Sequence, residues 1–343
     1  MGYAMSSLKI PVATLGVPRI GRKRELKFAL ESCWSGKSSA AELLATAKAL
    51  RAASWQEQRA RGVTKIPSND FSLYDHVLDT AIMVGAIPAA YGWNGGEVPL
   101  AAYFAMARGS EGAAGQACQH PDHVHGRGVP ALEMTKWFDT NYHYMVPELS
   151  CDQAFSLAST KPLDEFLEAK ALGIHTRPVI LGPVTFLKLA KSQEENFEPL
   201  SLLPRLLPVY EELLQRLRLA GADWVQIDEP ALALDLIPNE REAFGFAYSR
   251  LAAAEPQVKI MLASYFGGLG DNLDTAIGLP VAGLHVDLLR APEQLETIGR
   301  LAPKSMVLSL GLIDGRNVWR ANLVSVLDRI KPLVAGWPLE RIE

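Results

Sequence analysis

Short apolar runs alternate with longer segments of helical period along most of this chain. Runs typical of buried parallel strands are Val179–Leu181, Trp224–Ile227, Ile260–Ala263, Leu284–Val286 and Met306–Leu310, and earlier candidates are Val12–Gly16, a short run near Phe71, and Trp137–Val146. Segments with helical period are Arg24–Cys33, Ala40–Arg61, Leu73–Val84, Leu163–Leu172, Leu202–Ala220, Glu240–Ala254, Glu293–Leu301 and Ala321–Leu333. The alternation predicts repeated β–α–β units, and therefore a mainly parallel sheet covered by helices.

The number of alternating units favours a barrel over an open sheet. About seven or eight strands on one chain predict an α/β protein of the (β/α)8, TIM-barrel type. The segment Leu202–Ala220 carries an apolar stripe at three- and four-residue spacing, which suits a helix packed on a sheet. No Gly-x-Gly-x-x-Gly motif follows the first strand, and the run GGLGDN at 267–272 has a different spacing. A dinucleotide-binding fold is therefore not favoured.

Composition and charge exclude several classes of protein. The chain has 343 residues, 48% hydrophobic and 21% charged, which is ordinary for a globular protein. Its net charge of −4 provides no general attraction to nucleic acid or to an anionic membrane. The longest uncharged run, Ala81–Gly96, is shorter than the roughly 20 apolar residues of a membrane-spanning helix. The three cysteines, Cys33, Cys118 and Cys151, have no paired spacing, so we expect a reducing, cytoplasmic setting.

Basic residues gather where the first predicted helix begins. The stretch GVPRIGRKRELK, residues 16–27, ends an apolar run in a Gly/Pro turn and then crowds Lys and Arg around the helix start. Cations in a first helical turn oppose the helix dipole, at a cost of about 0.3–1 kcal/mol each. A carboxylate or phosphate would reverse that sign, because free N–H groups and cationic side chains would face it. The stretch is therefore either an anion site or a solvated basic patch.

Aromatic and polar residues alternate in a second stretch, EMTKWFDTNYHY, residues 133–144. The alternation is typical of a half-buried strand with one polar face. Lys136, Asn141 and His143 offer hydrogen-bond donors suited to an acidic or amide-bearing ligand. The alternative is a core hairpin whose polar groups are satisfied internally.

Two adjacent carboxylates follow the predicted strand at Trp224–Ile227. In a barrel, Asp228 and Glu229 would lie at the carboxyl end of the strand, where catalytic groups gather. Neighbouring residues on a strand point to opposite faces, so the two would not act as a close pair without a bulge. One of them is a candidate general base or ammonium ligand, and the alternative is a carboxylate that closes a hydrogen bond at the strand end.

A histidine-rich loop, Cys118–His125, contains residue types that suit zinc. All of its candidate ligands lie in one glycine-flanked loop without a rigid scaffold or supporting hydrogen bonds. We therefore interpret it as a solvated loop rather than a metal site.

With these residues laid out, the chain closely resembles the amino-terminal half of cobalamin-independent methionine synthase, a 5-methyltetrahydropteroyltriglutamate–homocysteine methyltransferase. The motifs that carry the resemblance are LGVPRIGRKRELK, EMTKWFDTNYHYMVPE, ILGPVT, WVQIDEPAL, GLHVDL and GLIDGRNVWRA, and they run along nearly the whole chain. The resemblance implies two face-to-face barrels, of which residues 1–343 form the amino-terminal, folate-tail-binding one.

The resemblance also implies which residues bind substrate. Arg24, Glu25, Leu26 and Lys27 match the family's folate-contacting RELK segment. Lys136 and Asn141 match its second folate-contacting stretch. A triglutamate tail is the kind of anion that the basic helix start would hold.

Zinc and homocysteine belong to the other barrel of such an enzyme. The resemblance implies zinc held by His, Cys, Glu and Cys of the carboxyl-terminal barrel, no cobalamin, and no catalytic residue or metal ligand in this chain. The copy of QIDEP here would have lost its catalytic use. We expect the chain to dock against that second barrel, to be inactive alone, and to lack at least the last barrel strand, which would begin around Leu339–Glu343.

A rival hypothesis from another class is a self-sufficient barrel hydrolase or decarboxylase. In that enzyme Asp228, Glu229 and His143 would perform acid–base chemistry on a small substrate. Activity without a zinc-bearing partner would favour it.

Overall fold

The computed structural model describes residues 10–110 and 128–343, and its centre is a six-stranded parallel sheet. Across the sheet the strands are β1 (Ile66–Ser68), β5 (Thr176–Leu181), β7 (Trp224–Asp228), β8 (Lys259–Ala263), β9 (Gly283–Asp287) and β10 (Val307–Gly311). One isolated parallel bridge extends each edge, Ala13 with Lys65 beside β1 and Ile342 with Leu308 on β10. Eight segments of chain therefore follow one another in a parallel order.

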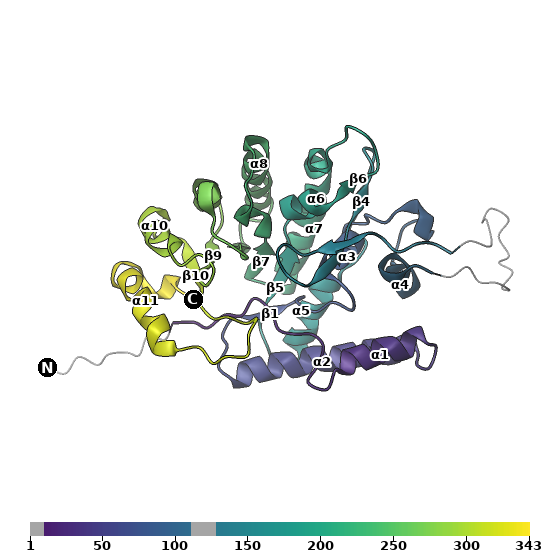
Figure 1. Cartoon of the computed structure of the whole chain (residues 1–343), viewed down its shortest axis with the longest axis horizontal. Coiled ribbons are helices and arrows are strands. Elements are labelled where there is room, and N and C mark those ends of the chain that lie inside the picture. The colour runs from purple at the N-terminus through teal and green to yellow at the C-terminus, as the bar shows by residue number, and fades with distance from the viewer. Residues whose placement is uncertain (1–9, 111–127) are drawn as a thin grey trace.

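The sheet curls, and helices surround its outer face (Figure 1). This arrangement confirms the predicted α/β fold of the barrel type. Among the described residues no hydrogen bond of the sheet joins its two edges, so they form an open, curled sheet and not a closed ring. The predicted run Val12–Gly16 contributes only the bridge at Ala13, since Pro11 and Pro18 beside it cannot donate to a strand ladder.

Eight of the helices coincide with those predicted from periodicity. They are α1 (Glu25–Trp34), α2 (Ala40–Ala60), α3 (His76–Met83), α5 (Lys161–Ala171), α7 (Leu203–Ala220), α8 (Pro238–Ala254), α10 (Gln294–Leu301) and α11 (Leu323–Gly336). Three more, α4 (Leu100–Arg108), α6 (Pro183–Leu189) and α9 (Leu273–Gly278), were not predicted, because six to nine residues give too few turns for a clear period. Short 3-10 turns are η1 (Ala89–Tyr91), η2 (Pro199–Leu202), η3 (Pro230–Ala233), η4 (Gly270–Asn272) and η5 (Leu339–Arg341).

The predicted strand Trp137–Val146 is wrong in its extent. An antiparallel hairpin stands there, with β2 at Met134–Lys136 and β3 at His143–Met145, and it lies outside the six-stranded sheet. The residues between the strands form its turn, where Phe138 has a φ of 49°. A second small pair joins β4 (Glu148–Leu149) to β6 (Lys191–Ser192). Near Phe71, the strand is β1, which ends at Ser68.

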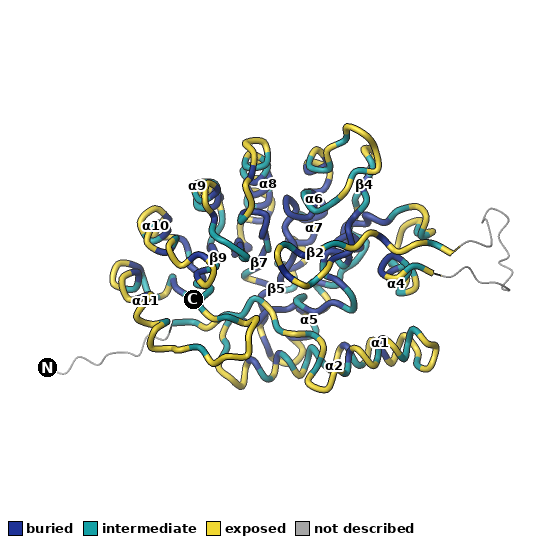
Figure 2. Tube along the Cα trace, in the orientation of Figure 1, coloured by how far each residue is buried: buried dark blue, intermediate teal, exposed yellow. Residues whose placement is uncertain are grey.

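The main core lies between the sheet and the helices around it, as the buried stretches in Figure 2 show. The predicted stripe of α7 faces this core, and its buried members are Leu203, Leu206, Leu207, Tyr210, Leu213, Leu214 and Leu217. Burying each such side chain contributes about 1.5–3 kcal/mol. Of the helices formed by the described residues, none combines the length and apolar character needed to cross a bilayer.

Candidate functional site

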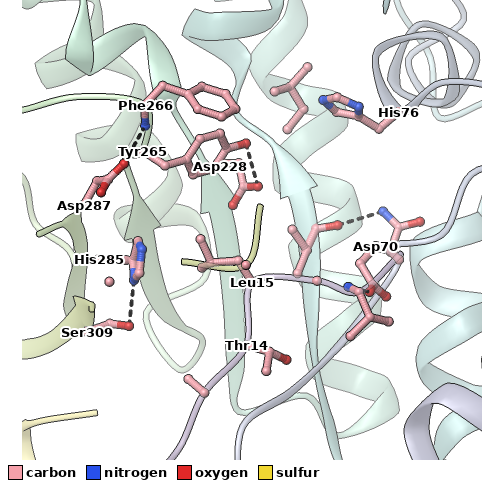
Figure 3. Close-up of a pocket in the computed structure, with 18 of the residues that line it drawn as sticks. Thr14, Leu15, Asp70, His76, Asp228, Tyr265, Phe266, His285, Asp287 and Ser309 are labelled. Carbon is pink, nitrogen blue, oxygen red and sulfur yellow. Dashed lines mark hydrogen bonds between the residues drawn. The ribbon is translucent and has the colours of Figure 1, made fainter. Parts of the chain in front are cut away.

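A cavity of about 670 Å³ opens at the carboxyl ends of the parallel strands (Figure 3). The strand ends of the sheet contribute Leu181, Asp228, Tyr265, Phe266, His285, Asp287, Ser309 and Gly311 to its wall. The segment Ala13–Arg19 and the hairpin residues Trp137 and Tyr142 complete it from the other side. Its size suits a small organic ligand, and its position is where barrel enzymes place theirs.

Asp228 is the last residue of β7, and its carboxylate faces the cavity (Figure 3). One oxygen accepts a hydrogen bond from Gln226 Nε2 at 2.7 Å, and the other accepts one from the Tyr265 hydroxyl at 3.0 Å. Burial raises the pKa of Asp228 to about 6, and these two hydrogen bonds oppose that rise. At neutral pH this carboxylate is therefore mostly ionised.

Glu229 points away from the cavity and holds the first turn of α6. Its carboxylate accepts hydrogen bonds from the backbone N–H groups of Thr185 at 2.7 Å and Val184 at 3.3 Å, and from the Tyr248 hydroxyl at 3.2 Å. The side chain is fully buried, and burial raises its pKa to about 7. The two neighbours thus serve opposite faces, as the strand geometry predicts, with Asp228 toward the cavity and Glu229 toward a helix.

A second carboxylate, Asp70, borders the cavity from the loop after β1. Its Oδ2 accepts a hydrogen bond from the backbone N–H of Val17 at 3.0 Å, which ties the amino-terminal segment across the cavity. At Gly16 a Cβ would lie 3.3 Å from that of Asp70, so a glycine suits this crossing. Burial raises the pKa of Asp70 to about 7.

Arg19 connects the amino-terminal segment to the hairpin. Its Nη1 donates to the Tyr142 hydroxyl at 3.1 Å, and its Nη2 donates to the carbonyl of Tyr74. The guanidinium also lies 5.5 Å from the centre of the Tyr142 ring, a cation–π contact. Both sequence stretches predicted to carry chemistry therefore reach one cavity, through Arg19 and Tyr142.

His285, on β9, presents a neutral imidazole to the cavity. Its Nδ1 lies 2.9 Å from the Ser309 hydroxyl, and burial lowers its pKa to about 4. Beside it, Asp287 accepts hydrogen bonds from the backbone N–H groups of Phe266, Leu289 and Arg290, which fixes that loop.

Aromatic rings form one wall of the cavity. Trp137 and Phe266 lie with ring centres 6.4 Å apart, and Phe266 packs edge-on against Tyr265 at 4.7 Å. Phe266 has a φ of 76°, a left-handed conformation that costs about 1–3 kcal/mol in a bulky residue. Such strain persists where surrounding contacts impose it, and functional sites are where it concentrates.

The predicted substrate-binding residues lie outside this cavity. Arg24 is the exposed residue that precedes α1, with a φ of 61°, and Lys27 is half-exposed and forms an ion pair with Glu31 at 3.6 Å. Glu25 accepts a hydrogen bond from the backbone N–H of Lys23 at 2.9 Å. Leu26 is buried between α1 and α2.

The hairpin residues singled out in the sequence are exposed. Lys136 ends β2, Asn141 lies in the turn, and His143 begins β3 with its Nδ1 3.1 Å from the Asn141 carbonyl. None of the three lines the cavity. The trio of the rival hypothesis is therefore not assembled, since Asp228 alone faces the cavity while Glu229 holds α6.

No group of three or more potential metal ligands comes together within residues 10–110 and 128–343. The loop Cys118–His125 lies outside the described residues. Cys33 and Cys151 are free thiols. The described part of the chain thus gives zinc no set of ligands.

Sequence reasoning missed several cavity residues, of which Tyr265, His285 and Asp70 matter most. Tyr265 and Asp70 follow strand ends. Because barrel enzymes carry their catalytic groups at the carboxyl ends of strands, both could have been selected from the sequence. His285 lies inside the apolar run Gly283–Asp287, where a lone histidine gave no separate signal.

The chain matches the family model described as "Cobalamin-independent synthase, N-terminal domain" over residues 11–337. A 5-methyltetrahydropteroyltriglutamate–homocysteine methyltransferase from Mesorhizobium japonicum is 76% identical over 335 residues, covering 97% of this chain and 43% of the relative. The enzyme of that name from Caulobacter vibrioides is 64% identical over 340 residues, covering 98% and 44%. The chain therefore spans less than half the length of these relatives.

Solved structures share the fold at low sequence identity. The putative vitamin-B12-independent methionine synthase from Listeria monocytogenes aligns with a TM-score of 0.63 at 15% identity, covering 98% of this chain and 91% of that one. A B12-independent methionine synthase from Shewanella sp. W3-18-1 aligns with a TM-score of 0.60 at 14% identity, covering 89% and 81%. At such identities the likeness concerns the fold alone.

Proposed function

Because the chain belongs to the cobalamin-independent methionine synthase family, as its N-terminal domain, we propose that it works as the amino-terminal part of a methyltransferase. In this proposal the whole enzyme moves a methyl group from 5-methyltetrahydropteroyltriglutamate to homocysteine and makes methionine in the cytoplasm. The observation that carries it is the 76% identity, over 97% of the chain, to a methyltransferase of that name.

In this proposal the methyl transfer itself takes place in the part of the longer relatives that this chain does not cover. Zinc bound there would lower the pKa of the homocysteine thiol and supply a thiolate nucleophile. The described residues of this chain provide no cluster of ligands for such an ion. This half would bind the substrate's tail and position the other half, without cobalamin and without acting on the methyl group itself.

We assign the triglutamate tail to Arg24, Glu25, Leu26, Lys27, Lys136 and Asn141. Arg24, Lys27 and Lys136 are exposed cations that suit tail carboxylates. Asn141 can donate from its amide, whereas Glu25 and the buried Leu26 would take part through their main chain. Exposed ion pairs contribute about 0.2–1 kcal/mol each and weaken with salt, so tail binding should be salt-sensitive.

Calorimetric titration with triglutamyl and monoglutamyl methyltetrahydrofolate tests this assignment. We expect the triglutamate to bind more tightly, and Lys27→Ala to weaken its binding several-fold with no change in thermal unfolding. Lys331→Ala is the matched control, because Lys331 is also an exposed helical lysine with a local partner, Asp328 at 2.5 Å. Equal binding of both folates, or no effect of Lys27→Ala, would remove Lys27 from the site.

Docking to the remaining part of the enzyme is supported by an apolar surface on and before α11. Its members are Val318, Trp319, Leu323, Val324 and Leu327, and Val318 and Trp319 are 93% and 81% exposed. Contiguous apolar patches of this kind mark protein interfaces. Sedimentation with the separately produced carboxyl-terminal part of the Mesorhizobium relative tests it: Trp319→Ser should reduce association, while Leu219→Ser, an exposed leucine on α7, should not.

A further inference from the structure

Two carboxylates face the cavity without an ion pair, although Lys161 lies close enough to Asp70 to oppose the rise of its pKa. Asp70 and Asp228 accept hydrogen bonds from Val17, Gln226 and Tyr265, and neither forms an ion pair with any described residue. Of the other acidic groups of the cavity, Asp314 accepts a hydrogen bond from the backbone N–H of Arg316 at 2.8 Å, and three more are compensated. Asp79 has Lys161 at 3.3 Å, Glu343 has Arg177 at 2.7 Å, and Asp287 accepts three backbone N–H groups.

The basic residues at the rim do not supply the missing charge. Arg19 donates to Tyr142 and to a backbone carbonyl, Arg290 pairs with Asp139, and Lys161 lies 3.2 Å from Glu165 as well as close to Asp79. Arg316, the fourth cation of the cavity wall, is exposed, and none of the four forms an ion pair with Asp228. The negative charge of Asp228 is therefore left for a ligand.

A polar group two strands away from Asp228 also has an atom without a partner. His285 is only 7% exposed and uses Nδ1 on Ser309, while its Nε2 has no hydrogen-bond partner among the described residues. The ring belongs to the cavity wall, on the strand after the one that leads to Tyr265 (Figure 3). Because the imidazole is neutral, it does not repel a cation, and Nε2 remains for a polar group of the ligand.

The surroundings favour an organic cation over a metal ion. Within the described part of the chain no three metal-ligating side chains lie together, so the carboxylates do not form a metal cage. Instead, Tyr265 contacts Asp228, Phe266 lies beside Tyr265 (Figure 3), and the ring centres of Trp137 and Phe266 are 6.4 Å apart. Aromatic faces attract ammonium groups and cover the apolar body attached to them.

We propose that this cavity binds a small primary amine with an apolar body. Its ammonium group contacts the Asp228 carboxylate, and its body packs on the rings of Phe266 and Trp137. Asp70 adds negative potential from the opposite wall. The site is separate from the proposed tail-binding residues, none of which lines the cavity.

Calorimetric titration with 2-phenylethylamine tests the proposal, and 2-phenylethanol is the matched neutral probe. We expect the amine to bind at least tenfold more tightly than the alcohol, which corresponds to about 1.4 kcal/mol. Asp228→Asn should weaken amine binding by about tenfold and leave alcohol binding unchanged. Asp70→Asn should weaken amine binding by a smaller factor.

Glu195→Gln, at an exposed carboxylate remote from the cavity wall, is the control for loss of one negative charge. Thermal unfolding of each variant shows that it is folded, and Asp70→Asn provides a second test if Asp228→Asn is not. The proposal is overturned if the folded chain binds neither probe or binds both equally. It is also overturned if both Asp variants bind the amine like the Glu195→Gln control.

Discussion

The contact between Glu229 and α6 gives a prediction whose size follows from the structure. In Glu229→Gln the side chain keeps its shape but retains a single acceptor oxygen. The backbone N–H groups of Val184 and Thr185 both point at the carboxyl group and cannot rotate away. One of them must therefore face the new amide NH₂, and a buried donor loses its acceptor.

An unsatisfied buried donor costs about 1–3 kcal/mol, so we expect Glu229→Gln to lower the free energy of unfolding by that amount. The comparison is cleanest at pH 5.5. With a pKa of about 7, Glu229 is protonated there, and the substitution changes hydrogen bonding without changing charge. Asp228→Asn should cost less than about 1 kcal/mol, because its partners, Gln226 and Tyr265, are side chains that can reorient.

Urea unfolding followed by circular dichroism measures the loss of unfolding free energy in each variant. The slope of that free energy against urea concentration should match the parent, which shows that the unfolded states are comparable. A Glu229→Gln variant as stable as the parent would refute the role of this carboxyl group as the acceptor for α6. So would a larger loss in Asp228→Asn than in Glu229→Gln.

Three further predictions concern stability. Gly182→Ala should cost about 1–3 kcal/mol in urea unfolding, since its Cβ would lie 2.0 Å from the Glu229 carboxyl carbon. Lys161→Met should cost about 1.5–3 kcal/mol in the same assay, because Glu165 would lose a cationic partner at 3.2 Å but keep Arg51 at 3.7 Å. Asp70 has a folded pKa of about 7 against 3.8, so its ionisation destabilises the fold as pH rises from 4 to 7. Relative to the parent, Asp70→Asn should therefore gain stability across that interval, and a constant difference would contradict the raised pKa.

The long helices and the central strands were predictable because their patterns reflect burial directly. The stripe of α7 and the run at β7 each face one continuous core, so periodicity and apolar length carried the signal. The pattern predicts a strand at Trp137–Val146, with a core hairpin as the alternative for residues 133–144, because aromatic and polar residues alternate there too. The turn of the hairpin depends on the positive φ of Phe138. Phenylalanine rarely adopts such a conformation, so the sequence gives no signal for a turn at this residue.

The site was predictable by region but not by residue. The sequence pointed to residues 16–27 and 133–144, and the cavity uses Gly16–Arg19, Trp137 and Tyr142 from them. The named cations are instead on the surface, where they stay candidates for the tail. His285 could not be selected, since its importance comes from distant segments that the sheet brings together, whereas Asp70 and Tyr265 follow strand ends and were overlooked.

Residues 228 and 229 are adjacent in the sequence but have different structural roles. Glu229 is required by the architecture, because a helix start depends on it whatever the cavity contains. Asp228 faces only the cavity and the side chains around it. If both positions are randomised and only folded protein is selected, glutamate should be retained at position 229, whereas many residues should be tolerated at position 228. Retention of both would require selection for an occupant of the cavity.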